Sequence, residues 1–172
     1  MTTATAPALT ELTGTYTLDP AHTRIGFVAR HAMVTKVRGA FNEFEGTGVV
    51  DAADFTKSTV TVIIQAASID TRNEQRDGHL RSNDFLAMDE YPQITFVSTG
   101  ARQVDDSTFE LTGDLTIKGV TNPITIPFSF EGAVTINRKD YGITWNAALE
   151  TGGVLVSDKV TLEFEISAVK NA

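Results

Sequence analysis

Residues 107–118, STFELTGDLTIK, alternate between apolar and polar side chains along almost their whole length. The apolar positions in this stretch are Phe109, Leu111, Leu115 and Ile117. Successive side chains of a β-strand point to opposite faces of its sheet, so a period of two places the apolar set on one face. One apolar and one polar face are typical of an antiparallel sheet with one side in water. The stretch therefore predicts an antiparallel strand.

The same alternation recurs along most of the chain. We expect strands at about 15–19, 23–34, 38–50, 59–65, 93–103, 107–118, 122–131, 142–150 and 159–168, two of which can form one bent strand. Their connections are short and rich in turn-forming residues, as in Asp105-Asp106-Ser107. About eight antiparallel strands of this length commonly close into a barrel, which removes exposed sheet edges. The sequence thus predicts an all-β fold, an eight-stranded antiparallel barrel.

Residues 70–92, DTRNEQRDGHLRSNDFLAMDEYP, interrupt this pattern because they are rich in charge and do not alternate. We expect two short helical pieces here, at 73–81 and 83–88, with Asn83 as an N-cap and Pro92 as the end of the segment. This helical insertion is expected to pack across one end of the barrel. Residues 1–13, rich in Thr and Ala, are expected to form a loose tail, and 14–170 a single barrel domain.

The charge of the chain disfavours several classes of partner. Its 22 acidic and 14 basic residues give a net charge of −8, which repels phosphate backbones and anionic membrane surfaces. The chain has no cysteine, so disulfides and thiolate sites are excluded. The N-terminal residues show neither a basic segment nor an apolar one, and no run reaches the roughly 18 apolar residues of a membrane span. We therefore expect a cytoplasmic protein.

The inside of a small barrel is either filled by its own side chains or holds one ligand. The chain has ten Phe, three Tyr and one Trp, which is a large aromatic supply for the inner face of a small barrel. Aromatic side chains line many ligand sites, but they also fill ordinary cores. The pattern alone leaves both alternatives open.

Three histidines are the candidates for polar chemistry. Strand alternation places His31 on the same face as Ile25 and Phe27, so it is expected to point inward. It could be a buried neutral histidine, a contact for a ligand head group or a metal ligand. His22 is expected at a strand entrance, and His79 falls in the helical insertion. Their spacing matches no metal motif, and no nucleophile or nucleotide-binding motif is present, so we expect neither a metal site nor a cofactor.

Several segments resemble the YceI-like family. They are Y-x-L-D-P-x-H at 16–22, F-x-x-x-H at 27–31, R-G-x-F at 38–41, HLRSNDFLAMDEYPQITFVST at 79–99, GDLTIKGVTNPITIPFSFEG at 113–132 and I-N-R-x-D-Y-G at 136–142. The resemblance covers about 14–168. Thr23 stands where Ser is more usual in that family, and Tyr141 where Phe is more usual. Many members carry a signal peptide, which is not seen here.

The resemblance implies a lipocalin-like barrel with a helical segment and a long apolar tunnel. Such a tunnel would hold a polyisoprenoid, an isoprenoid quinone or a fatty acyl chain, and the protein would bind, store or transport this amphiphilic lipid without catalysis. A homodimer is also implied. Two alternatives remain: an enzyme acting on a lipid-like substrate with His31 as base, and a filled structural barrel related to stress.

Strand alternation and the resemblance together give a list of expected ligand contacts. A one-residue error in register would exchange this inward set for the outward one. His31 is expected to contact the head group, and the other residues to form the apolar wall. The expected contacts are Phe27, His31, Met33, Phe41, Phe44, Val62, Ile64, Phe96, Leu115, Phe128, Phe130, Ile143 and Trp145.

Overall fold

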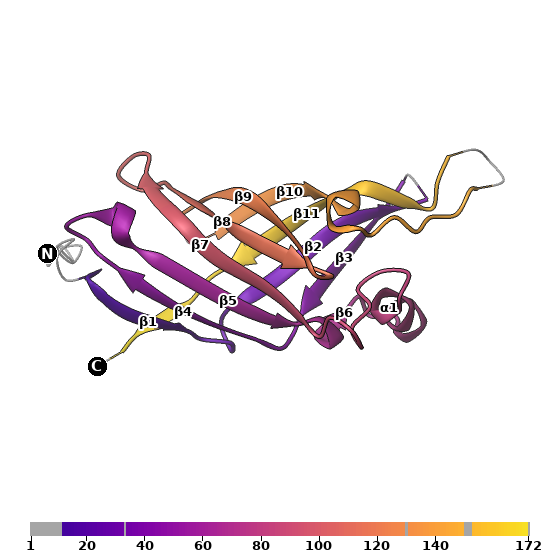
Figure 1. Cartoon of the computed structure of the whole chain (residues 1–172), viewed down its shortest axis with the longest axis horizontal. Coiled ribbons are helices and arrows are strands. Elements are labelled where there is room, and N and C mark those ends of the chain that lie inside the picture. The colour runs from indigo at the N-terminus through magenta and orange to yellow at the C-terminus, as the bar shows by residue number, and fades with distance from the viewer. Residues whose placement is uncertain (1–11, 33, 130, 150–152, 172) are drawn as a thin grey trace, which may run out of the picture.

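A computed structural model of the chain describes residues 12–32, 34–129, 131–149 and 153–171. Strands dominate this part of the chain, with one α-helix at one end of a long barrel and the first and last strands toward the other end (Figure 1). The strands are β1 (Gly14–Leu18), β2 (Arg24–His31), β3 (Thr35–Phe41), β4 (Phe44–Val50), β5 (Thr59–Gln65), β6 (Ile69–Asp70), β7 (Gln93–Gln103), β8 (Phe109–Ile117), β9 (Val120–Phe128), β10 (Glu131–Asn137), β11 (Val156–Glu165) and β12 (Ala168–Lys170). The helix α1 spans Glu74–Arg81, and the short 3-10 turns are η2 (Phe55–Lys57), η3 (Ala66–Ser68) and η4 (Arg138–Tyr141).

All strand pairs are antiparallel, and the hydrogen-bonded order is β12-β1-β4-β5-β7-β8-β9-β10-β11-β2-β3-β6. The chain itself joins the two ends of this order, because several consecutive strands are halves of one bent strand. β1 continues into β2, β3 into β4, β5 into β6 and β11 into β12. Counting each bent strand once leaves eight from the twelve, and each of the eight pairs with two neighbours. The predicted eight-stranded antiparallel barrel is confirmed.

The bend between β11 and β12 is fixed by hydrogen bonds to the bend between β1 and β2. The carbonyl of Ser167 accepts from the Asp19 amide at 2.9 Å and from the Thr23 hydroxyl at 2.9 Å. The Ser167 amide in turn donates to Thr23 Oγ1 at 3.0 Å. These bonds satisfy backbone groups that the change of strand would otherwise leave unpaired.

The alternation in 107–118 appears in the structure as predicted. Leu111, Leu115 and Ile117 of β8 are buried in the core. On the outer face the Thr112 hydroxyl lies 3.0 Å from that of Thr125, and the Thr116 hydroxyl 2.7 Å from that of Thr121. Hydroxyl pairs of this kind link neighbouring strands on the side that faces water.

The helical insertion covers one end of the barrel, as expected. α1 begins after Asn73, whose side chain accepts from the Arg76 amide. The second predicted helix, 83–88, is wrong: the chain forms successive turns there, and Ala87 has a left-handed backbone with φ of 48°. This conformation cannot continue a helix, and it turns Phe85 and Leu86 into the core.

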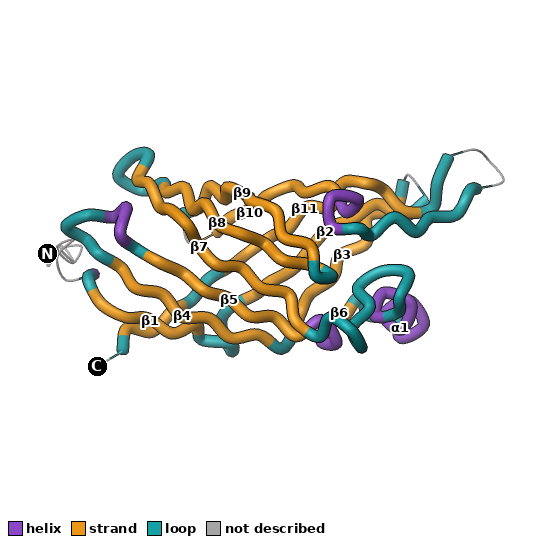
Figure 2. The backbone as a smooth tube through the Cα atoms, viewed as in Figure 1, coloured by secondary structure: helices purple, strands orange, loops and turns teal. Residues whose placement is uncertain are grey.

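The sequence misplaced one strand near the C-terminal third. The expected strand at 142–150 is absent from the described residues of that range, apart from an isolated bridge at Ala148, and β10 occupies 131–137 instead. The reason is a side chain: Arg138 Nη1 donates to the carbonyls of Ile143 and Trp145 at 2.8 and 2.9 Å. These carbonyls are thus satisfied without a neighbouring strand, and the segment runs beyond the barrel end (Figure 2).

No helix in the described part of the chain is long and apolar enough to cross a membrane.

Candidate ligand-binding site

The inner face of the barrel is packed unevenly. On the side formed by β7 and β8, inward residues such as Ile94, Phe96 and Leu115 are fully buried. In β10 and β11, by contrast, none of the described residues is buried, although their apolar side chains contact the core. Apolar side chains that pack against the core and still reach solvent show that the packing is less complete on these two strands.

These partly covered side chains form a continuous wall across three strands. Val134 of β10 pairs with Leu162 of β11, and Leu162 pairs in turn with Phe27 of β2. Ile136 lies opposite Val160 in the same ladder. Side chains directly opposite on one face of antiparallel strands lie about 4.5–5.5 Å apart at Cβ, so they form one surface. We refer to Val134, Ile136, Val160, Leu162 and Phe164 as the inner wall.

The expected apolar contacts fall in the interior wherever the structure describes them. Some are fully buried, and others are partly covered and pack against the buried set. The buried ones are Phe27, Ile64, Phe96, Leu115 and Ile143, and the partly covered ones are Phe41, Phe44, Val62 and Trp145. All nine therefore belong to the hydrophobic core or pack against it, Ile143 and Trp145 from outside any strand, while their contact with a ligand stays a prediction. Met33, Phe130 and the side chain of Phe128 lie outside the described residues.

The expectation that His31 points into the barrel is wrong. His31 is the last residue of β2, and both it and its neighbour Arg30 are exposed. Alternation assigned the correct face, but the core ends before this residue, so both faces of the strand are in water there. His22 lies at a strand entrance as expected, with Nδ1 2.6 Å from Asp19 Oδ2. This hydrogen bond holds the pKa of the Asp19 carboxyl below its usual value.

An aromatic cluster covers the barrel end beside α1. The ring of Trp145 lies 4.6 Å from that of His79 and 5.4 Å from that of Phe85, measured between centroids. His79 and Phe85 are themselves 5.0 Å apart with perpendicular rings, a favourable edge-to-face arrangement. His79 Nε2 is also 2.8 Å from Asp84 Oδ2. The helical insertion therefore contributes a histidine and a phenylalanine to this closure.

Arg138 holds the backbone of the segment that carries Trp145. Its side chain is only 4% exposed, and besides its bonds to the 143–145 segment its Nε donates to the Ser157 carbonyl at 2.9 Å. Burial lowers the pKa of Arg138, and the Asp158 carboxylate at 3.5 Å opposes this shift. A guanidinium has several donors in a fixed plane, so one side chain can bind three separate carbonyls.

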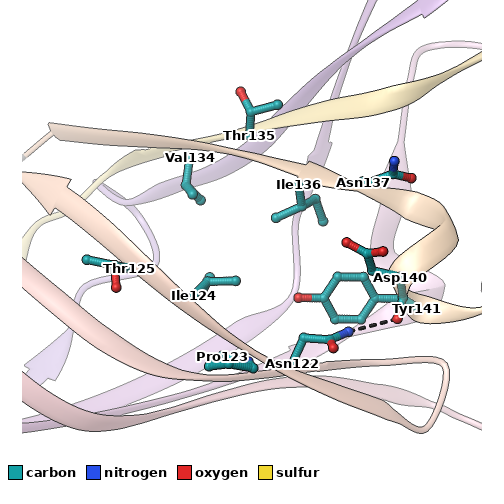
Figure 3. Close-up of a pocket in the computed structure, with 10 residues that line it drawn as sticks. All are labelled: Asn122, Pro123, Ile124, Thr125, Val134, Thr135, Ile136, Asn137, Asp140 and Tyr141. Carbon is teal, nitrogen blue, oxygen red and sulfur yellow. Dashed lines mark hydrogen bonds between the residues drawn. The ribbon is translucent and has the colours of Figure 1, made fainter.

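An opening lies between β9 and β10, beside the inner wall. The described residues of β9 and β10 share a single ladder pair, Gly132 with Phe128, after which the two strands diverge. Figure 3 shows the resulting gap, which has a volume of about 360 Å³. Ile124, Val134 and Ile136 line its inner part and Thr125 and Thr135 its outer part, where both threonines are exposed. We refer to this gap as the side opening.

Tyr141 lies at the floor of the side opening. It is the last residue of η4, and its ring points from this turn into the gap, with the hydroxyl toward Ile124 and Val134 (Figure 3). The residue is 1% exposed, and its hydroxyl makes no hydrogen bond with any described residue. Burial raises the pKa of Tyr141, and the Asp140 carboxylate adds to the rise. The Asn122 side chain lies near enough to the hydroxyl to oppose this rise, but its amide donates to the Asp140 carbonyl at 2.8 Å and forms no hydrogen bond with the hydroxyl.

Sequence reasoning missed Tyr141 and the inner-wall residues as parts of a site. Ile124, Val134 and Ile136 alternate with polar residues, and this signal could have identified them. Tyr141 falls in the 136–142 segment, where no alternation of apolar and polar residues indicates a buried side chain. Arg138 of the same segment forms an ion pair with Asp158. Within the described residues, no group of three or more His, Cys, Asp or Glu is placed to hold a metal ion.

Comparison with known proteins agrees with this architecture. Residues 16–168 match the YceI-like domain. UPF0312 protein SAS2572 of Staphylococcus aureus (strain MSSA476) is 41% identical over 169 residues, covering 89% of this chain and 95% of that protein.

Solved structures share the fold. BcnA of Burkholderia cenocepacia gives a TM-score of 0.78 at 24% identity, covering 89% of this chain and 99% of its own. A polyisoprenoid-binding domain from Saccharophagus degradans, implicated in plant cell wall breakdown, gives 0.67 at 16% identity, covering 91% and 98%. The barrel, the helical insertion at its end and a sequence match over most of the length lead to one conclusion: the chain belongs to the YceI-like domain family.

Proposed function

We propose that the protein binds a long-chain amphiphilic lipid, a polyisoprenoid or an isoprenoid quinone, inside its barrel, and that it stores or transports this lipid without changing it chemically. The observation that carries the proposal is the inner wall of β10 and β11, whose apolar side chains face inward yet remain partly uncovered. Covering this wall with a prenyl tail would remove apolar surface from water, at about 25 cal/mol per Å². The family, and a fold shared with a polyisoprenoid-binding domain, support the same choice.

The alternative, an enzyme with His31 as base, depended on an inward-facing His31, which the structure does not show. General base catalysis requires the base within hydrogen-bond reach of the substrate proton. His31 is exposed at the end of β2, beyond the buried part of the strand, and its exposure gives no support for a base that acts on a tail bound inside the barrel. The exposure of His31 likewise gives no support for its expected contact with the head group.

The proposal is tested by filling the interior. Leu162 is the inner-wall residue that pairs with both Val134 and Phe27, so Leu162→Trp should occupy the space that a tail needs. Titration with the C20 alcohol geranylgeraniol, followed by native mass spectrometry, should show binding to the wild type and a loss of binding in this variant. Val97→Trp is the matched control, because Val97 is 47% exposed on the outside of the tightly packed β7.

Equal binding by Leu162→Trp, Val97→Trp and the wild type would contradict a tail site in the barrel. Thermal unfolding of each variant separates a blocked site from a lost fold, since a variant that keeps its cooperative transition has kept the barrel.

A further inference from the structure

The folding of the barrel does not explain why the Tyr141 hydroxyl is buried without a hydrogen-bond partner among the described residues. A buried polar group without a hydrogen bond is costly, and the great majority of such groups in native proteins have a partner. Of the buried side-chain polar atoms in the described residues, the Tyr141 oxygen is the one without a partner. The hydroxyl points into the side opening, where an exchangeable ligand could supply that partner (Figure 3).

Access to the interior also points to the side opening. The barrel end beside α1 is covered by Trp145, His79 and Phe85. Near the other end, the rings of Phe55 in η2 and Phe109 in β8 lie 4.7 Å apart. Between these two aromatic contacts, the divergence of β9 and β10 leaves a gap beside Val134 and Ile136, which belong to the inner wall.

The charge of the side opening restricts the head group. Asp140 is among the described residues that line it, and none of those residues is Lys or Arg. A phosphate or diphosphate group would meet a carboxylate here without a cation to balance it, and phosphate sites normally provide Arg, Lys or several backbone amides. A tyrosine hydroxyl can instead donate one hydrogen bond to an uncharged oxygen.

We propose that the side opening is the seat of the ligand's polar end, where the Tyr141 hydroxyl donates a hydrogen bond to an uncharged oxygen, the carbonyl of a prenylated quinone or the hydroxyl of a prenyl alcohol. This inference rests on the proposed function, because it assigns the head group of a lipid whose tail lies along the inner wall. The side opening has a volume of about 360 Å³, near the lower limit for small-molecule sites, and this volume suits a head group and the first part of a tail.

The test compares four probes that share a branched C20 chain and differ in the head group. They are the quinone menaquinone-4, the alcohol geranylgeraniol, geranylgeranyl diphosphate and the hydrocarbon phytane, which has no head group. The wild type should bind the quinone or the alcohol more tightly than phytane, and the diphosphate more weakly than either. Tyr141→Phe should lower the affinity for the preferred oxygen-bearing probe by roughly three- to tenfold, the value of one hydrogen bond, and leave phytane unchanged. The probe with the larger loss identifies the source of the oxygen.

Tyr16→Phe on β1 is the matched control, since the Tyr16 hydroxyl donates to the Leu12 carbonyl and Tyr16 does not line the side opening. Unchanged affinity of Tyr141→Phe for both oxygen-bearing probes would overturn the inference while leaving the proposed function intact. Tightest binding of the diphosphate would also overturn it. Failure of the wild type to bind any of the four probes would overturn the proposed function itself.

A second experiment locates the polar end in the side opening. Because the chain has no cysteine, Thr135→Cys can be labelled uniquely with a bulky maleimide at the outer rim of the gap. The label should weaken binding of geranylgeraniol several-fold. The same label on Thr47→Cys, at an exposed position of β4, should have no effect. Equal affinities for the two labelled proteins would contradict the placement.

Discussion

Tyr141 combines near-complete burial with a hydroxyl that bonds to no described residue. Leaving a buried donor unsatisfied costs about 1–3 kcal/mol, so the hydroxyl is not there to stabilise the ligand-free fold. Tyr141→Phe removes the hydroxyl and keeps the ring, and it should leave stability at neutral pH unchanged or slightly higher. Arg138 is the contrasting case, because its buried donors are bound to carbonyls and hold the 143–145 segment in place.

The raised pKa of Tyr141 gives a prediction at alkaline pH. An unfolded tyrosine loses its proton near its ordinary value of 10.0, while the folded state, with its higher pKa, retains the proton to higher pH. The unfolded state therefore binds fewer protons in this range, and stability falls as pH rises above the unfolded value. Urea unfolding at about pH 8 and about pH 11 should show a smaller loss of stability for Tyr141→Phe than for the wild type. Equal losses would show that Tyr141 does not titrate differently on folding.

Residue positions could be predicted from the sequence only within a strand. Alternation placed Phe27, Ile64, Phe96 and Leu115 on the inner face, as the structure confirms. It failed for His31, because a period of two identifies a face and not the point where the core ends. Tyr141 could not be found this way, since its orientation depends on η4 and on the divergence of two strands.

At the scale of elements, Phe96 of β7 packs over Gly113 of β8, which leaves no room for a side chain at position 113. A Cβ built on Gly113 would lie 2.5 Å from the Phe96 ring and 2.6 Å from the Val97 carbonyl oxygen, and the backbone oxygen cannot move aside cheaply. Gly113→Ala should therefore destabilise the barrel by about 1–3 kcal/mol in urea unfolding. Gly100→Ala is the control from the same ladder, because a Cβ there meets nothing within 4 Å. Equal effects of the two substitutions would contradict this account of the packing.

Elements were predictable where local pattern decides them. The strands from 59–65 and 107–118 match β5 and β8 closely, because each alternates over its length, and the strand from 159–168 overlaps most of β11. The strand expected at 142–150 failed because Arg138, a residue outside it, binds its carbonyls. The second helix failed because Ala87 adopts a left-handed backbone that its sequence context does not indicate.

At the scale of the whole molecule, the barrel follows from strand alternation, whereas the partly uncovered inner wall does not. Alternation assigns apolar residues to the inside without showing whether their side chains pack against one another. The structure shows that they do at β7 and β8, and that β10 and β11 remain partly uncovered. The proposed ligand-binding function rests on this asymmetry, which strand alternation does not indicate.

The most direct test of this account is native mass spectrometry of the protein purified from its own host, followed by denaturation and identification of any released lipid. We predict a stoichiometric bound species with a prenyl tail and an uncharged oxygen-bearing head group, released when the barrel unfolds. A protein that is purified without lipid, and that binds none of the C20 probes when they are added, would contradict the account.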